Sequence, residues 1–108
     1  MNPLITQKCK PLDGGEPMSA SELEAHLRNV EGWALRDGSI EKTYRFGNYH
    51  ETMAFVNALA WIAHAEDHHP DLLVKYDSAQ VRFNTHSVGG ISINDFICAA
   101  KADALLEI

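Results

Sequence analysis

Hydrophobic and polar positions recur with two different periods along this chain, and their order predicts the fold. The first helical period follows Ser19, where Leu23, Leu27 and Val30 share one face. Glu22, three residues after Ser19, completes a capping box of the kind that begins helices. This pattern predicts a short helix that ends at a glycine.

Strand-like segments follow in two pairs, each pair joined by residues that favour tight turns. Lys42 interrupts the apolar face of one of these segments, but a half-buried strand remains the best interpretation. The predicted hairpins are residues 33–46, with an Asp37-Gly38 turn, and residues 72–85, with an Asp77-Ser78 turn.

Two further helices are predicted, one between the hairpins and one after them. Asn48 resembles the start of a second capping box, and the helix should end near Asp67 because Pro70 disfavours helix before it. Ser92 and Asp95 are expected to cap the last helix. The expected inner faces are Met53, Phe55, Val56, Leu59, Ala60, Ile62 and Ala63 in the first, and Ile93, Phe96, Ile97, Ala100 and Ala104 in the last.

The order α-β-β-α-β-β-α predicts an α+β fold, with one four-stranded antiparallel sheet and three helices on one face. A chain of 108 residues with 45% hydrophobic residues forms one domain with its own core. Three of the four prolines and a Gly-Gly pair lie before residue 18. We therefore expect a flexible leader over residues 1–18 and a single domain over residues 19–108.

Charge and composition exclude several classes of function. The net charge of −6 argues against nucleic acid as a partner. No apolar run is long enough to span a membrane, and no secretory signal is visible, so a cytoplasmic protein is expected. In that reducing compartment Cys9 and Cys98 are expected to be free thiols, one in the tail and one in the core.

Three histidines are the candidate chemistry. His68 and His69 are adjacent, and His86 ends the last predicted strand, so they are expected to meet at one edge of the sheet. A lone histidine near a helix C-terminus is usually a surface residue favoured by the helix dipole. Three imidazoles that titrate near neutral pH favour proton-transfer chemistry instead.

A histidine metal site is the alternative. His64 and His68 lie one helical turn apart, a spacing that can chelate zinc. Ala65 stands where the zincin motif requires glutamate, and a zinc deaminase pattern beginning at His64 lacks its cysteine half. Nucleophilic catalysis is weaker still, because Ser87 and Ser92 lie in no Gly-x-Ser-x-Gly turn.

The spacing of these residues resembles one known family. The pattern His64-x3-His68-His69-Pro70-x5-Tyr76-x9-His86-x8-Asp95 is similar to the signature of pterin-4a-carbinolamine dehydratases. The similarity runs from about Leu23 to Leu105 and matches seven positions at fixed spacing. The family fold is the same α+β sandwich. The first position is often glutamate in animal members and is His64 here.

The resemblance implies a hydro-lyase, a 4a-hydroxytetrahydrobiopterin dehydratase. Aromatic amino acid hydroxylases leave their tetrahydropterin hydroxylated at carbon 4a, and this family removes water to give quinonoid dihydropterin. The pterin is the substrate, so no cofactor is implied. The implied residues are His68, His69 and His86 for catalysis, Asp67, Asn84, Thr85 and Ser87 with these histidines for binding the pterin, and Asp95 as a support.

Some interpretations stay open at this stage. Asp95 either orients a histidine or is simply a first-turn carboxylate favoured by the helix dipole. Trp61 and Tyr76 are expected in the core rather than stacked on a ligand. The wide apolar face of residues 49–67 suggests burial by another subunit, and the family forms dimers and tetramers. A homodimer or homotetramer linked to phenylalanine hydroxylase is expected, and a non-catalytic dimerisation or binding module is the competing function.

Overall fold

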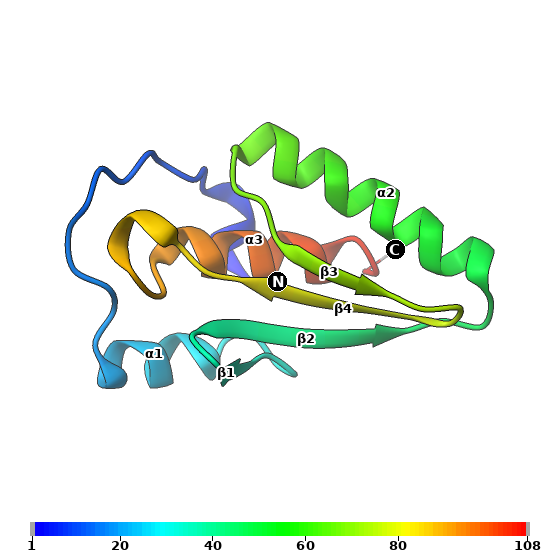
Figure 1. Ribbon diagram of the computed structural model, residues 1–108, viewed down its shortest axis with the longest axis horizontal. Helices are drawn as coiled ribbons and strands as arrows, with labels where there is room; N and C mark the ends of the chain where they lie inside the picture. The colour runs from blue at the N-terminus through cyan, green and yellow to red at the C-terminus, as the bar shows by residue number, and fades with distance from the viewer. Residues whose placement is uncertain (1, 108) are drawn as a thin grey trace.

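A four-stranded antiparallel sheet carries α2 and α3 side by side on one face (Figure 1). The computed structural model describes residues 2–107. The predicted α+β order is confirmed, with two short 3-10 helices added. In chain order the elements are η1 (Pro3–Thr6), α1 (Ala20–Leu27), β1 (Ala34–Arg36), β2 (Ser39–Arg45), α2 (Tyr49–Glu66), β3 (Asp71–Val74), β4 (Ser78–Phe83), η2 (His86–Val88) and α3 (Ile93–Ala104).

The strands lie in the order β1-β2-β4-β3 and are joined by two hairpin turns of different kinds. Asp37 and Gly38 both have positive φ, at 49° and 78°, as a type I′ hairpin turn requires. This prediction is confirmed. In the second hairpin the Lys75 N–H donates to the Ser78 carbonyl at 2.9 Å. The turn therefore lies at residues 75–77, and Ser78 belongs to β4 rather than to the predicted turn.

The two faces of the sheet differ in polarity, which explains why helices cover one face. Ile40 pairs with Phe83 across β2 and β4, and both side chains are buried under the helices. On the other face the Glu41 carboxylate forms ion pairs with Arg36 and Arg82, with Nε–Oε distances of 3.2 Å in both. Since only one face is apolar, only that face has to be covered.

Helix α2 begins and ends where the sequence predicts. Asn48 Oδ1 accepts the Glu51 N–H at 2.8 Å, but the Glu51 carboxylate accepts from Gly47 rather than from Asn48. The second capping box is therefore only half formed. Asp67 adopts a left-handed conformation, with φ 52°, that stops the helix. The buried residues of the helix are Thr52, Phe55, Leu59, Ala63 and Glu66.

Two aromatic residues expected in the core are on the surface instead, so this prediction is wrong. Trp61 is 71% exposed and Tyr76 is 64% exposed. Trp61 lies on the outer side of α2, where its ring is 5.5 Å from that of His64. Tyr76 lies in the β3–β4 turn, and its ring stacks on Tyr49 at 6.4 Å. Each ring contacts another ring at the surface, and the large apolar area of these side chains alone did not predict this exposure.

Helix α3 is the most deeply buried helix among residues 2–107. It packs against α2, β4 and η1, and the His26 ring of α1 stacks on Phe96 at 5.0 Å. Several alanines let these neighbours approach closely. Of the predicted inner face, Ile93 and Ala104 are only half-buried. The buried residues are Asn94, Asp95, Phe96, Ile97, Cys98, Ala99, Ala100 and Ala102.

The N-terminal residues are attached to the domain, which differs from the flexible leader expected over residues 1–18. Leu4 is buried in the core, and the Cys9 N–H donates to Glu66 Oε1 at 2.8 Å. The Met18 N–H donates to the Ile91 carbonyl at 2.8 Å. The domain boundary at residue 18 stays a prediction, and Met1 and Ile108 lie outside the described residues.

Length and hydropathy together argue against a bilayer-crossing helix anywhere in residues 2–107.

Candidate functional site

A buried carboxylate at the start of α3 is the centre of the candidate site. Asp95 is fully buried, and its Oδ2 accepts the Ser92 N–H at 2.9 Å, which completes the capping box of α3. The Thr85 hydroxyl donates to the same oxygen at 2.8 Å. The other oxygen, Oδ1, lies 2.6 Å from Nε2 of His68. Asp95 therefore caps the helix with one oxygen and holds a histidine with the other.

The end of α2 places His68 against this carboxylate. The left-handed turn at Asp67 lets the His68 N–H return to the Ala63 carbonyl at 3.1 Å, and the ring stacks on Phe83 at 5.9 Å. The side chain is 12% exposed. Burial opposes protonation, but the hydrogen bond and the charge of Asp95 outweigh it and raise the pKa of His68 above its ordinary value.

Two hydroxyls connect the end of β4 to the same carboxylate. The single hydroxyl proton of Thr85 goes to Asp95, so the Ser92 hydroxyl donates to Thr85 Oγ1 at 2.7 Å. Thr85 also pairs with Gly90 through its backbone, which closes the loop that contains His86. The segments after α2 and β4 thus meet around Asp95.

The other proposed site residues lie outside this buried network. His69, His86, Ser87 and Asp67 are exposed, and the half-buried Asn84 donates to the Ser39 hydroxyl at 3.1 Å. Among residues 2–107 no hydrogen bond joins the His69 or His86 rings to Asp95, and their roles stay predictions.

The structure gives the metal alternative no ligand set within its described residues. Although His64 and His68 are one turn apart, the exposed His64 ring lies against Trp61 and His68 is turned to Asp95. Residues 2–107 contain no group of three or more histidine, cysteine or acidic side chains arranged to hold a metal ion.

Sequence reasoning missed a second buried carboxylate beside the site. Glu66 Oε2 forms ion pairs with Nζ of Lys101 at 2.8 Å and Nζ of Lys8 at 3.4 Å, and Oε1 accepts the Cys9 N–H. Burial opposes ionisation, but these partners lower the pKa of Glu66 to about 2. The available signal was its position, since Glu66 continues the buried face of α2 after Leu59 and Ala63.

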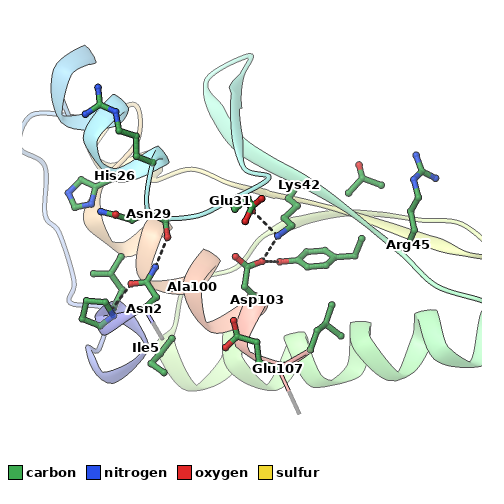
Figure 2. A pocket seen from close by; sticks show the side chains of 16 residues that line it. Asn2, Ile5, His26, Asn29, Glu31, Lys42, Arg45, Ala100, Asp103 and Glu107 are labelled. Atoms are coloured by element: carbon green, nitrogen blue, oxygen red, sulfur yellow. Dashed lines mark hydrogen bonds and ion pairs between the residues drawn. The ribbon is translucent and has the colours of Figure 1, made fainter.

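A cavity of about 960 Å³ lies at a different place (Figure 2). It is formed by residues of η1, α1, β2 and α3, and at its wall Lys42 reaches the Glu31 carbonyl and Asp103, each at 2.9 Å. A second cavity of about 330 Å³ lies between Phe55 and the residues after α3. Neither of these two cavities is lined by His68, His69 or His86.

Comparisons with known proteins agree with this architecture. The family model described as Pterin 4 alpha carbinolamine dehydratase matches residues 16–105. Two proteins named "Putative pterin-4-alpha-carbinolamine dehydratase" are 53% and 56% identical to the chain. The first, from Nitrosomonas europaea, matches over 96% of this chain and 94% of its own. The second, from Stenotrophomonas maltophilia, matches over 97% and 93%.

Solved structures show the same fold. A transcriptional coactivator/pterin dehydratase from Brucella melitensis superposes with a TM-score of 0.80 at 28% identity, covering 83% of this chain and 98% of its own. A pterin dehydratase-like protein, identified as a RuBisCO assembly factor in the alpha-carboxysome, has a TM-score of 0.57 at 23% identity, covering 68% and 84%. This second likeness concerns the fold alone.

The fold and these likenesses define an α+β protein of the pterin dehydratase class. The chain belongs to the pterin 4 alpha carbinolamine dehydratase family, whose members are hydro-lyases.

Proposed function

We propose that the chain dehydrates 4a-hydroxytetrahydropterin to quinonoid dihydropterin, with His68 as the general acid. The 2.6 Å hydrogen bond between His68 Nε2 and Asp95 Oδ1 is the observation that carries this role. It raises the pKa of His68 and so favours the imidazolium, the form that can donate a proton. Because Nε2 is held by Asp95, Nδ1 is the nitrogen left to transfer a proton.

The proton transfers balance without a redox step. His68 Nδ1–H protonates the hydroxyl on carbon 4a, and the carbon–oxygen bond breaks as the N5 lone pair forms a double bond to that carbon. Water leaves, and a base then removes the N5 proton to give the quinonoid product. His69 is proposed as this base, since it directly follows His68 and is exposed. The pterin itself accommodates the charge, so we propose no metal or organic cofactor.

Pterin binding is assigned to the exposed surface around the acid. We propose that His86 orients the pterin ring, and that Asp67, Asn84, Thr85 and Ser87 contact its edge largely through their backbone. The Thr85 hydroxyl is already donated to Asp95, which supports a backbone role for this residue. Such an enzyme would serve an aromatic amino acid hydroxylase by renewing its cofactor.

Replacing His68 tests the acid directly. His68→Ala is expected to lower the dehydration rate about 100-fold or more, the usual size of a general acid's contribution. The measurement follows freshly generated 4a-hydroxytetrahydropterin by ultraviolet absorbance, with circular dichroism as a check on folding. His64→Ala is the matched control, because this exposed histidine lies in the last turn of α2, shortly before His68, and its replacement is expected to leave the rate unchanged.

Wild-type turnover in a folded His68→Ala variant would refute the acid role. A chelator is expected to have no effect. Activity that a chelator abolishes and zinc restores would favour the metal site instead.

A non-catalytic binding module of the same fold is the second candidate. Large apolar side chains are exposed on α2 and β3, with Trp61 71% and Leu73 53% exposed. These residues support burial by a second copy in a homodimer or homotetramer. The coactivator name of the Brucella melitensis structure also favours a binding role. No acceleration of pterin dehydration over buffer would favour this candidate.

A further inference from the structure

Two cysteines at opposite ends of the chain meet beside the candidate site. Cys9 and Cys98 are 89 positions apart, yet their Sγ atoms lie 3.5 Å from each other. Cys98 is fully buried on α3, one turn after Asp95, whereas Cys9 is half-buried in the N-terminal segment. Such a pair is close enough for its sulfurs to react with a small movement of one side chain.

The contact is built by hydrogen bonds on both sides of Cys9. Its own N–H donates to the buried Glu66 carboxylate at 2.8 Å. The next residue, Lys10, exchanges two hydrogen bonds with the Asn94 side chain, at 3.1 and 2.8 Å. Because Glu66 belongs to α2 and Asn94 to α3, the segment is fixed to two helices and Cys9 is positioned by both.

The surroundings give the two thiols different reactivity. A hydrogen bond from the Cys98 thiol lowers the pKa of Cys9, and the charges of His68 and Lys101 add to this effect. Burial and the negative charge of Glu66 oppose it without cancelling it. Cys98, hydrogen-bonded to Cys9 and buried, has a raised pKa. The half-buried Cys9 is therefore the sulfur that ionises and reacts first, and Cys98 is its neutral neighbour.

We propose that Cys9 and Cys98 form a reversible intramolecular disulfide when the protein meets hydrogen peroxide, and that this bond fastens the N-terminal segment to α3. The Cys9 thiolate attacks one peroxide oxygen, giving a sulfenic acid and a hydroxide that takes up a proton. The Cys98 sulfur then attacks the Cys9 sulfur, and the sulfenic hydroxyl leaves as water with the Cys98 proton. Two thiols lose two electrons in all, and one peroxide becomes two waters.

Neither cysteine is assigned a part in the proposed dehydration chemistry. Cys9 lies outside residues 16–105, the part of the chain that the family model matches. The disulfide would close a loop that contains His68, His86 and all four strands of the sheet. Closing so long a loop restricts the unfolded chain, so the oxidised protein should be the more stable form.

Peroxide treatment of the reduced full chain tests the proposal. Both thiols should disappear together, and peptide mapping without reductant should find Cys9 linked to Cys98 within a single chain. Dithiothreitol should restore both thiols. The melting temperature is expected to rise by about 5–15 °C on oxidation. Disulfides between two chains, Cys9 sulfinic acid beside a free Cys98, or a linked protein with an unchanged melting temperature would overturn the proposal.

Two variants separate the roles of the thiols. Cys9→Ser is the main control because its side chain is only half-buried, and it should abolish both the linkage and the thermal shift. Cys98→Ala should leave the Cys9 sulfenic acid without a partner, so that dimedone labels it. A Cys9→Ser protein that still gains stability on oxidation would contradict the assignment, as would dimedone labelling no greater in Cys98→Ala than in wild type.

Discussion

Two carboxylates at opposite ends of α3 each accept several hydrogen bonds, but from different kinds of side chain. Asp95, in the first turn, accepts hydrogen bonds from His68, Thr85 and the Ser92 backbone. Asp103, near the last turn, accepts from Lys42 at 2.9 Å, from the Tyr44 hydroxyl at 2.5 Å and from the Trp33 indole at 3.2 Å. Asp103 thereby joins α3 to Lys42 and Tyr44 of β2. Asp95 joins α3 to Thr85, which follows β4.

The difference lies in which partner protons can move near neutral pH. Lysine and tyrosine ordinarily titrate near pH 10. At Asp103, burial and the neighbouring carboxylate raise the pKa of Tyr44 further, so this cluster keeps its protons. At Asp95 the partner is the His68 imidazole, whose pKa this carboxylate raises. Similar hydrogen bonding of a carboxylate thus gives a fixed cross-link at one end of the helix and, at the other, holds the imidazole that we propose as the proton donor.

Replacing each carboxylate should separate catalysis from scaffolding, and the largest effect is expected at Asp95. Asp95→Asn removes the charge that favours the His68 imidazolium, so the dehydration rate should fall about 100-fold. Its pH profile should also move to lower pH. Asp103→Asn is the matched variant on the same helix and should keep its rate within about threefold. Equal losses of dehydration rate in the two variants would contradict the idea that only Asp95 supports catalysis.

A stability effect without a catalytic one is expected at Asp103. Asp103→Ala leaves the Tyr44 hydroxyl, the Trp33 indole and the Lys42 ammonium short of an acceptor, which should cost about 2–3 kcal/mol. Urea unfolding followed by tryptophan fluorescence measures this directly, since Trp33 is in the cluster. Glu107→Ala, an exposed neighbour, should change the midpoint little. A loss at Glu107 as large as that at Asp103 would show that the cluster is not the cause.

The smallest expected effect is a pH-dependent contribution to stability from His68. Its pKa is raised in the folded protein, so the stabilisation is fully present below the unfolded value of about 6.5 and is lost as pH rises through the folded value. The difference in unfolding free energy between wild type and His68→Gln should therefore shrink from acidic to alkaline pH. In an Asp95→Asn background the same difference should be nearly independent of pH, and a persistent slope there would point to another group.

Local rules predicted much of the fold from sequence. The capping box at Ser19, the Asp37-Gly38 turn and the end of α2 before Pro70 each depend on residues close together in the chain, and all three are observed. The second capping box failed in one detail because Gly47 competes with Asn48 for the Glu51 carboxylate. Trp61 and Tyr76 were misplaced because exposure depends on packing between distant elements.

The site was predictable in its residue types and only partly in its geometry. Helix boundaries predicted from Pro70 and from the Ser92 cap placed His68 after one helix and Asp95 at the start of another, and the support of a histidine by Asp95 was implied only by the family resemblance. Which oxygen caps the helix and which holds the ring depends on atomic positions that a pattern does not contain. Glu66 and its lysines were missed because they join the N-terminal segment, α2 and α3 across long sequence separations.

The burial of α3 has a consequence for the protein during synthesis. The sheet and α2 leave the ribosome before α3, so their apolar faces stay uncovered until the last helix follows. Phe96 and Ile97 of this helix belong to the buried core that also contains strand and α2 residues. The nascent chain should therefore be a client for chaperones that bind exposed apolar segments, and it should become resistant to protease only once α3 has emerged.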